Sequence, residues 1–155
     1  MYELYQTQHG SRGSLSEVWI DRQAGLVRKQ YKPNGITITG NHPLHTDMDE
    51  IRRLYENEVS WSESLRSDMV VPILDHGSLA DDTGWFILQP YYGPDLLHYF
   101  KPDTRLSHRI PDATEQIIRM FQWYKAHDLY KYNNAMANMT LHGDRLVAFD
   151  FKYAA

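Results

Sequence analysis

The chain has 155 residues, of which 42% are hydrophobic and 23% are charged, and its formal net charge is −4. This size and composition predict one globular domain with its own core and leave no room for two full domains. The negative charge offers no electrostatic reason to bind nucleic acid, and the absence of cysteine excludes disulfides and thiol nucleophiles. No apolar run approaches the ~18 residues of a membrane span, so we expect no membrane partner and a cytoplasmic location.

The first third of the sequence predicts antiparallel strands. The candidate strands are residues 2–6, Glu17–Asp21 and Leu26–Tyr31. Polar and apolar residues alternate in the last two, and turn residues at 23–25 indicate a tight hairpin between them. Residues 33–47 are rich in Pro, Gly and Asn and predict a loop.

One helix is predicted after Thr46 or Asp47, either of which can serve as its N-cap. Asp49 and Glu50 place negative charge in the first turn, where the helix dipole favours it. The residues at helical spacing on one face are Ile51, Leu54, Tyr55, Val59, Ser62 and Leu65. Glu58 falls on the same face, and a buried carboxylate is costly unless a cation pairs with it. We therefore expect a cationic partner for Glu58.

The middle of the sequence predicts further strands at 70–74 and 85–89, followed by a short helix at 95–101. Residues 130–140 predict an irregular segment, and 146–149 a last strand. The mixture of antiparallel strands and helices indicates an α+β fold.

A second long helix is predicted to begin at Asp112, which forms a capping-box pattern with Glu115. Its apolar face is expected to hold Ile117, Met120, Phe121, Tyr124 and His127.

Polar residues of catalytic type follow one another along this framework in a set order. The order is a Gly/Ser-rich loop, a strand Lys, a helix Glu, and an Asn and an Asp near the end. The residues are Gly13, Ser16, Lys29, Glu58, Asn138 and Asp150. This order resembles the signature set of the eukaryotic-type protein kinases and their aminoglycoside and choline phosphotransferase relatives.

Four segments carry the resemblance. Residues 11–18 (SRGSLSEV) stand where the family has G-x-G-x-x-G-x-V, and Gly10 can replace the first glycine by a shift of one. Residues 26–29 (LVRK) fit V-A-I-K loosely, and 85–93 (WFILQPYYG) resemble the strand and hinge that hold adenine. Residues 149–153 (FDFKY) resemble both D-F-G and the I-D-F-E-Y ending of choline-kinase-like enzymes.

The resemblance implies a minimal protein-kinase-like domain over residues 1–155. Residues 1–90 would form a small antiparallel N-lobe sheet with one helix, and 91–155 a hinge and a reduced helical C-lobe. It also implies ATP and Mg²⁺ as cofactors. The implied nucleotide-binding residues are Gly13, Ser16, Lys29, Glu58, Gln89 and Tyr91, with Asn138 and Asp150 as Mg²⁺ ligands and Lys29, Asn133 and Asp150 as the catalytic residues.

Two departures from the family pattern bear on activity. Residues 131–133 (KYN) stand where the family has H-R-D, so Asn133 occupies the place of the general base. An amide cannot take up a proton near neutral pH, although it can still orient a hydroxyl group. The chain also ends shortly after Asp150, before any activation segment, so the half of the site that would bind the acceptor is not visible.

The expected function is ATP- and Mg²⁺-dependent phosphoryl transfer to Ser or Thr hydroxyls of a protein. The alternatives are a pseudokinase that serves as a protein-binding module, a small-molecule kinase, and transfer of AMP instead of phosphate. An oligomer or a partner protein stays open as the source of an acceptor surface. The plainest alternative is a set of ordinary hairpins whose Gly/Ser turn and strand lysine face solvent.

Overall fold

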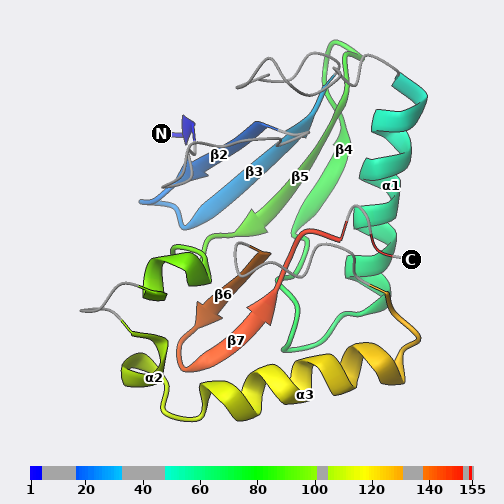
Figure 1. Ribbon diagram of the computed structural model, residues 1–155. Helices are drawn as coiled ribbons and strands as arrows, with labels where there is room; N and C mark the ends of the chain where they lie inside the picture. The colour runs from blue at the N-terminus through cyan, green and yellow to red at the C-terminus, as the bar shows by residue number, and fades with distance from the viewer. Residues whose placement is uncertain (5–16, 33–47, 101–104, 131–137, 152–153, 155) are drawn as a thin grey trace, which may run out of the picture. The chain divides into compact units, whose positions relative to one another are not determined.

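A five-stranded antiparallel sheet forms the first part of the protein in the computed structural model (Figure 1). The structure describes residues 1–4, 17–32, 48–100, 105–130, 138–151 and 154. The strands are β1 (Glu3–Leu4), β2 (Glu17–Asp21), β3 (Leu26–Tyr31), β4 (Asp75–Ser78) and β5 (Trp85–Pro90), in the spatial order β1-β2-β3-β5-β4. The predicted hairpin of β2 and β3 is confirmed with both strands at the expected residues.

The chain divides into two compact units. The sheet unit consists of Met1–Val59 and Ile73–Tyr91, and the hairpin unit of Ser60–Pro72 and Tyr92–Ala155. Helix α1 (Met48–Ser64) begins in the sheet unit, and its last residues belong to the hairpin unit. Each unit has its own buried core.

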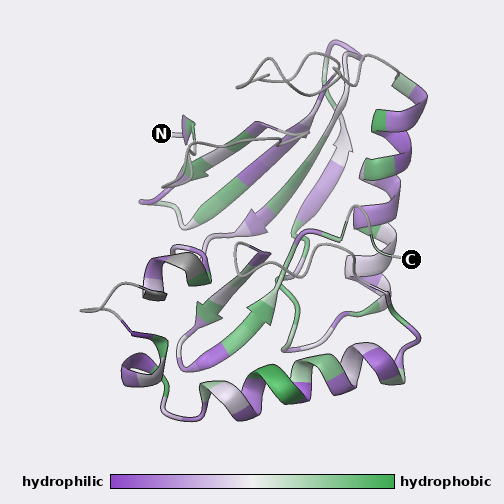
Figure 2. Ribbon diagram, in the orientation of Figure 1, coloured by the Kyte–Doolittle hydropathy of each residue, from purple (hydrophilic) through white to green (hydrophobic). Residues whose placement is uncertain are grey.

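Helix α1 and the sheet enclose the core of the sheet unit. The apolar stripe predicted for this helix is confirmed, with Ile51 and Leu54 almost fully buried. Figure 2 shows the polar and apolar residues distributed over the helix and along the strands. The core residues are Tyr31, Ile51, Leu54, Tyr55, Val59, Ile73 and Ile87, with Trp85 packed against them. Alternate residues of β3 and β5 therefore face α1, and the residues between them face away from it.

The hairpin unit places strands β6 (Met139–His142) and β7 (Arg145–Ala148) beside helix α3 (Ala113–Ala126). A short 3₁₀ helix η1 (Leu96–Phe100) and helix α2 (Leu106–Arg109) precede α3. The Gln116 side chain of α3 donates to the carbonyl of Asp144 and accepts from the amide of Leu146, which ties the helix to the hairpin turn.

The expected α+β class is confirmed, but several element predictions were wrong. Residues 70–74 do not form a strand, although Val70, Val71 and Ile73 are buried: Pro72 lacks an N–H, Leu74 is exposed, and the ladder with β5 is formed by β4 instead. Strand β6 occupies part of the segment expected to be irregular, and helix α2 was not anticipated.

Helix α3 begins as predicted after Asp112, but the Asp112 side chain makes no capping hydrogen bond. It accepts a hydrogen bond from the side chain of Gln116 instead. Phe121 and His127 are exposed, contrary to their placement on the apolar face, while Met120 and Tyr124 are buried as expected.

None of the helices in the described part of the chain has the length and apolar character needed to cross a membrane.

Gly84 is a point of close packing that supports strand β3. A Cβ atom at Gly84 would lie 1.9 Å from the carbonyl oxygen of Tyr31, whereas a Cβ at Gly25 would meet nothing within 4 Å. We expect Gly84→Ala to lower the free energy of unfolding by about 2–3 kcal/mol, because β3 or β5 must shift. Gly25 has a φ of 68°, so Gly25→Ala should lower the free energy of unfolding only by the strain of a left-handed backbone, about 1 kcal/mol. Urea unfolding of both variants measures this difference, and an equal loss would contradict the close packing.

The burial of Tyr124 predicts that the hairpin unit loses stability at alkaline pH. Its hydroxyl is buried and has no hydrogen-bond partner in the described part of the chain, and this burial raises the pKa of Tyr124. Above pH ~10 the unfolded chain ionises this tyrosine while the folded chain does not, so stability falls as the pH rises further. Tyr124→Phe should remove this part of the fall and leave stability at neutral pH unchanged or higher. Unfolding measured from pH 7 to alkaline pH tests this, and an unchanged alkaline fall in Tyr124→Phe would contradict it.

Candidate functional site

Lys29 is held inside the sheet unit by the alternation of strand β3. It pairs across the strands with Val18 on β2 and Ile87 on β5, so its aliphatic stem lies between two apolar neighbours. Only 5% of Lys29 is exposed. An ammonium group at such a depth requires a carboxylate partner, since a lone buried charge is strongly unfavourable.

Glu58 on α1 supplies that carboxylate. Its Oε1 atom lies 2.5 Å from Nζ of Lys29, and its side chain is fully buried. The cationic partner that the helix pattern predicted for Glu58 is therefore found, and it is Lys29. Two elements far apart in the sequence are joined here by one ion pair.

Tyr31 completes the group, and sequence reasoning missed it. Its hydroxyl donates a hydrogen bond to Oε2 of Glu58, so both carboxylate oxygens receive a donor from strand β3. Tyr31 is itself fully buried. The sequence pattern could have identified Tyr31, because it lies two residues after Lys29 and therefore on the same face of the strand.

Aromatic rings pack next to Tyr31 in the same core. The rings of Tyr31 and Tyr55 meet edge to face at 6.1 Å, and Tyr55 stacks on Trp85 at 5.8 Å. The Tyr55 hydroxyl lies 2.7 Å from Nδ1 of His76 on the edge strand β4. Lys29 and Glu58 are themselves almost inaccessible to water, and this burial strengthens their electrostatic attraction.

The residues expected to hold adenine lie on and after β5. Gln89 is buried within the strand. The backbone N–H of Tyr91, which a hinge would offer to the base, donates instead to the carbonyl of Gly25 at 2.8 Å. The Tyr91 hydroxyl accepts a hydrogen bond from Arg22 at 3.0 Å. Any adenine contact at this segment would therefore use a group other than the Tyr91 amide.

The expected metal ligands lie together at one end of the β6–β7 hairpin. Met139 pairs with Ala148, and the amide of Phe149 donates to the carbonyl of Asn138 at 3.1 Å. Asn138, before β6, and Asp150, after β7, therefore belong to the same end of the hairpin. Asp150 has a φ of 65°, a left-handed conformation that non-glycine residues seldom adopt.

The chemistry of these two side chains suits Mg²⁺. Amide and carboxylate oxygens are hard ligands, and Mg²⁺ commonly takes one or two protein oxygens and completes its shell with water and phosphate. Within the described ranges, no cluster of three or more His, Cys, Asp or Glu side chains could hold a metal without such help. A metal here would therefore need ligands besides the acidic and imidazole groups of the described ranges, such as water or phosphate.

The remaining predicted site residues, Gly13, Ser16 and Asn133, lie outside the described residues. The structure thus brings together Lys29 with Glu58 in the sheet unit, and Asn138 with Asp150 in the hairpin unit.

Comparison with protein-family models and with curated proteins gives no match to this chain. The resemblance to kinases therefore stays a prediction from the motifs.

The hydroxyl of Tyr31 should matter for stability more than an exposed one. Tyr31→Phe leaves Oε2 of Glu58 without this donor, which should lower the free energy of unfolding by about 1–3 kcal/mol. Tyr91→Phe, which removes a hydroxyl hydrogen-bonded to exposed Arg22, is the matched control and should cost less. Denaturant unfolding compares the two, and equal losses would show that Tyr31 does not support Glu58.

Proposed function

We propose that this protein binds ATP with Mg²⁺ and transfers a phosphoryl group to a hydroxyl acceptor, with Ser or Thr of a protein as the acceptor. The observation that carries this proposal is the buried contact between Lys29 and Glu58, whose side chains are 6% and 0% exposed.

The energetics of a buried ion pair support a ligand-binding role for Lys29. Removing two charges from water costs about as much as their attraction returns, and well-packed apolar residues often stabilise such a site as well or better. A buried Lys–Glu pair is therefore poor evidence of a contribution to stability. Lysine is a compact cation suited to phosphate oxygens, and Glu58, held in turn by Tyr31, would fix the position of its Nζ.

The hairpin unit supports the metal part of the proposal. Asn138 and Asp150 offer oxygen ligands at one end of the hairpin, as Mg²⁺ requires. The left-handed backbone of Asp150 adds support, because residues held in sparsely populated conformations cluster at functional sites. Bound Mg²⁺ would neutralise charge on the phosphates.

Phosphoryl transfer depends less on a general base than most reactions do, so Asn133 in its place does not rule out activity. In phosphoryl transfer the transition state is loose, so positioning and charge neutralisation supply most of the catalysis. The acceptor oxygen forms a bond to the γ-phosphorus, the bond to the ADP oxygen breaks, and the hydroxyl proton passes to solvent. Asn133 in place of the base should slow the step by about 10²–10⁴-fold relative to an enzyme that has one.

Asn133 also favours a second candidate, a pseudokinase that binds ATP and a partner protein without turnover. The products separate the candidates. Label from γ-labelled ATP on a protein supports the kinase, label on a small acceptor supports a small-molecule kinase, and label from α-labelled ATP indicates AMP transfer. Binding without any label transfer indicates the pseudokinase.

The proposal predicts different effects of two substitutions on ATP affinity. By isothermal titration calorimetry, Lys29→Met should weaken ATP binding by about tenfold or more both with Mg²⁺ and with EDTA, because Lys29 contacts the phosphates directly. Asp150→Asn should weaken binding only in the presence of Mg²⁺, because it removes a metal ligand.

Matched controls exist for both substitutions. Lys125→Met replaces an exposed lysine of α3, and Asp128→Asn changes another aspartate with a left-handed backbone, at a φ of 51°. Both should bind ATP as wild type does. Lys29→Met leaves Glu58 buried without its cation. The double variant Lys29→Met with Glu58→Gln avoids this unpaired charge, so it should fold better and serves as a second test. A wild-type protein that binds no ATP, or unchanged affinity in both Lys29 variants, would overturn the proposal.

A further inference from the structure

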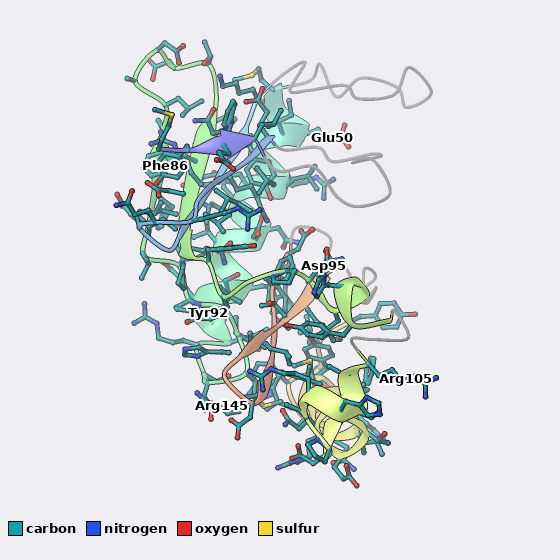
Figure 3. All side chains as sticks on the ribbon, turned by 90° about the vertical axis from the view of Figure 1, so that its left-hand side faces the viewer. Glu50, Phe86, Tyr92, Asp95, Arg105 and Arg145 are labelled. Carbon is teal, nitrogen blue, oxygen red and sulfur yellow. The ribbon has the colours of Figure 1, made fainter. Side chains whose placement is uncertain are left out.

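The face of the sheet that points away from α1 carries an unusual cross-strand row. Because Lys29 faces Glu58 on α1, its neighbour Arg28 projects from the opposite face. The strand registers place Leu4, Trp19, Arg28, Leu88 and Asp75 opposite one another across β1, β2, β3, β5 and β4. We call this the outer face of the sheet. Figure 3 shows Phe86 on β5 and Glu50 on α1 toward opposite sides of this sheet.

Arg28 is held against aromatic surface at the centre of the outer face. Its guanidinium carbon lies 4.7 Å from the centroid of the Phe86 ring. Its Nε atom is buried and has no hydrogen-bond partner, and Arg28 forms no ion pair with any residue in the described ranges. Trp19 and Leu88 flank it on the neighbouring strands.

Gly77 places no side chain beside the Phe86 ring on the outer face. Gly77 pairs with Phe86 across β4 and β5, and a Cβ atom there would already lie 3.4 Å from the phenyl ring. The indole N–H of Trp19 is occupied, because it donates to Glu17 at 3.1 Å. The described surface around Arg28 is therefore largely apolar, with one positive charge whose Nε–H has no acceptor among the described residues.

This arrangement is costly for the isolated chain. A buried N–H without an acceptor carries a desolvation penalty, and an apolar side chain in its place would avoid it. Arginine and tryptophan surrounded by apolar groups are, however, the residues that dominate binding energy at protein interfaces. A carboxylate brought by a partner would accept from the terminal nitrogens of the guanidinium and balance its charge, while the buried Nε–H stays out of its reach.

We propose that the outer face of the sheet docks a segment of another protein that presents a carboxylate flanked by apolar side chains. The carboxylate would accept hydrogen bonds from Arg28, since an arginine–carboxylate pair can form two parallel bonds. The apolar flanks would cover Trp19, Phe86 and Leu88. This surface lies wholly within the sheet unit and does not depend on ATP binding.

Charge favours a protein segment over nucleic acid. The chain carries a net charge of −4, and Glu17, Asp21 and Asp75 lie on the same face as Arg28. A polyanion would be repelled by these carboxylates, whereas a single carboxylate can be matched to the single guanidinium.

A peptide-display selection on the immobilised full chain tests the proposal. The probe is a library of random peptides, with the Arg28→Met variant as the counter-target. We expect enriched peptides that share an Asp or Glu between apolar residues and that bind Arg28→Met at least about tenfold more weakly than wild type. Arg22→Met, which replaces an exposed arginine next to β2, should bind them as wild type does.

The stability of the same variants separates a docking role from a structural one. Arg28→Met should unfold at the same temperature as wild type or higher, because it removes a buried N–H without an acceptor. Any of the following results would overturn the proposal: a lower melting temperature for Arg28→Met, no enriched peptides, or enriched peptides that lack a carboxylate or ignore Arg28. Self-association or oligonucleotide binding that is lost in Arg28→Met would overturn it in favour of a second copy or of nucleic acid.

Discussion

The buried contact between Lys29 and Glu58 is the constraint on which the sheet unit depends. One partner lies on β3 and the other on α1, and neither can be buried alone without a large penalty. The register of the sheet and the rotation of the helix are therefore coupled. Tyr31 strengthens this coupling from the same strand, since it donates to the second oxygen of Glu58. A slip of β3 by one residue would turn both Lys29 and Tyr31 away from the helix and bring Arg28 toward Glu58.

The same alternation that buries Lys29 creates the outer face of the sheet. Residues of β3 face α1 and the opposite side in turn, so a strand that carries a cation at two neighbouring positions presents one on each face. The inner cation has its acceptor within the sheet unit. The guanidinium of the outer one, Arg28, lies over Phe86, and its Nε–H has no acceptor among the described residues. The two proposals made for this protein, one for each face, thus arise from adjacent residues with opposite environments.

Periodicity was sufficient to predict the parts that depend on one element at a time. It located β2 and β3, the buried stripe of α1 and the need of Glu58 for a cation, and it held the signal for Tyr31. It failed where tertiary pairing decides. The polar segment Asp75–Ser78 forms an edge strand because β5 offers it a ladder, while the more apolar residues before it do not. Likewise, the bond from the Tyr91 amide to Gly25 and the left-handed backbone of Asp150 depend on neighbours distant in sequence or on turn geometry that no period encodes.

If the Lys29–Glu58 pair is kept for a phosphate ligand and not for stability, an apolar replacement of the whole buried group should separate the two properties. The decisive variant combines Lys29→Met, Tyr31→Phe and Glu58→Leu, so that both donors to Glu58 are removed together with its carboxylate. We expect its free energy of unfolding to lie within about 1 kcal/mol of wild type or above it, while calorimetry detects no binding of ATP with Mg²⁺. A folded triple variant that binds ATP with wild-type affinity would contradict the assignment of Lys29 to the nucleotide.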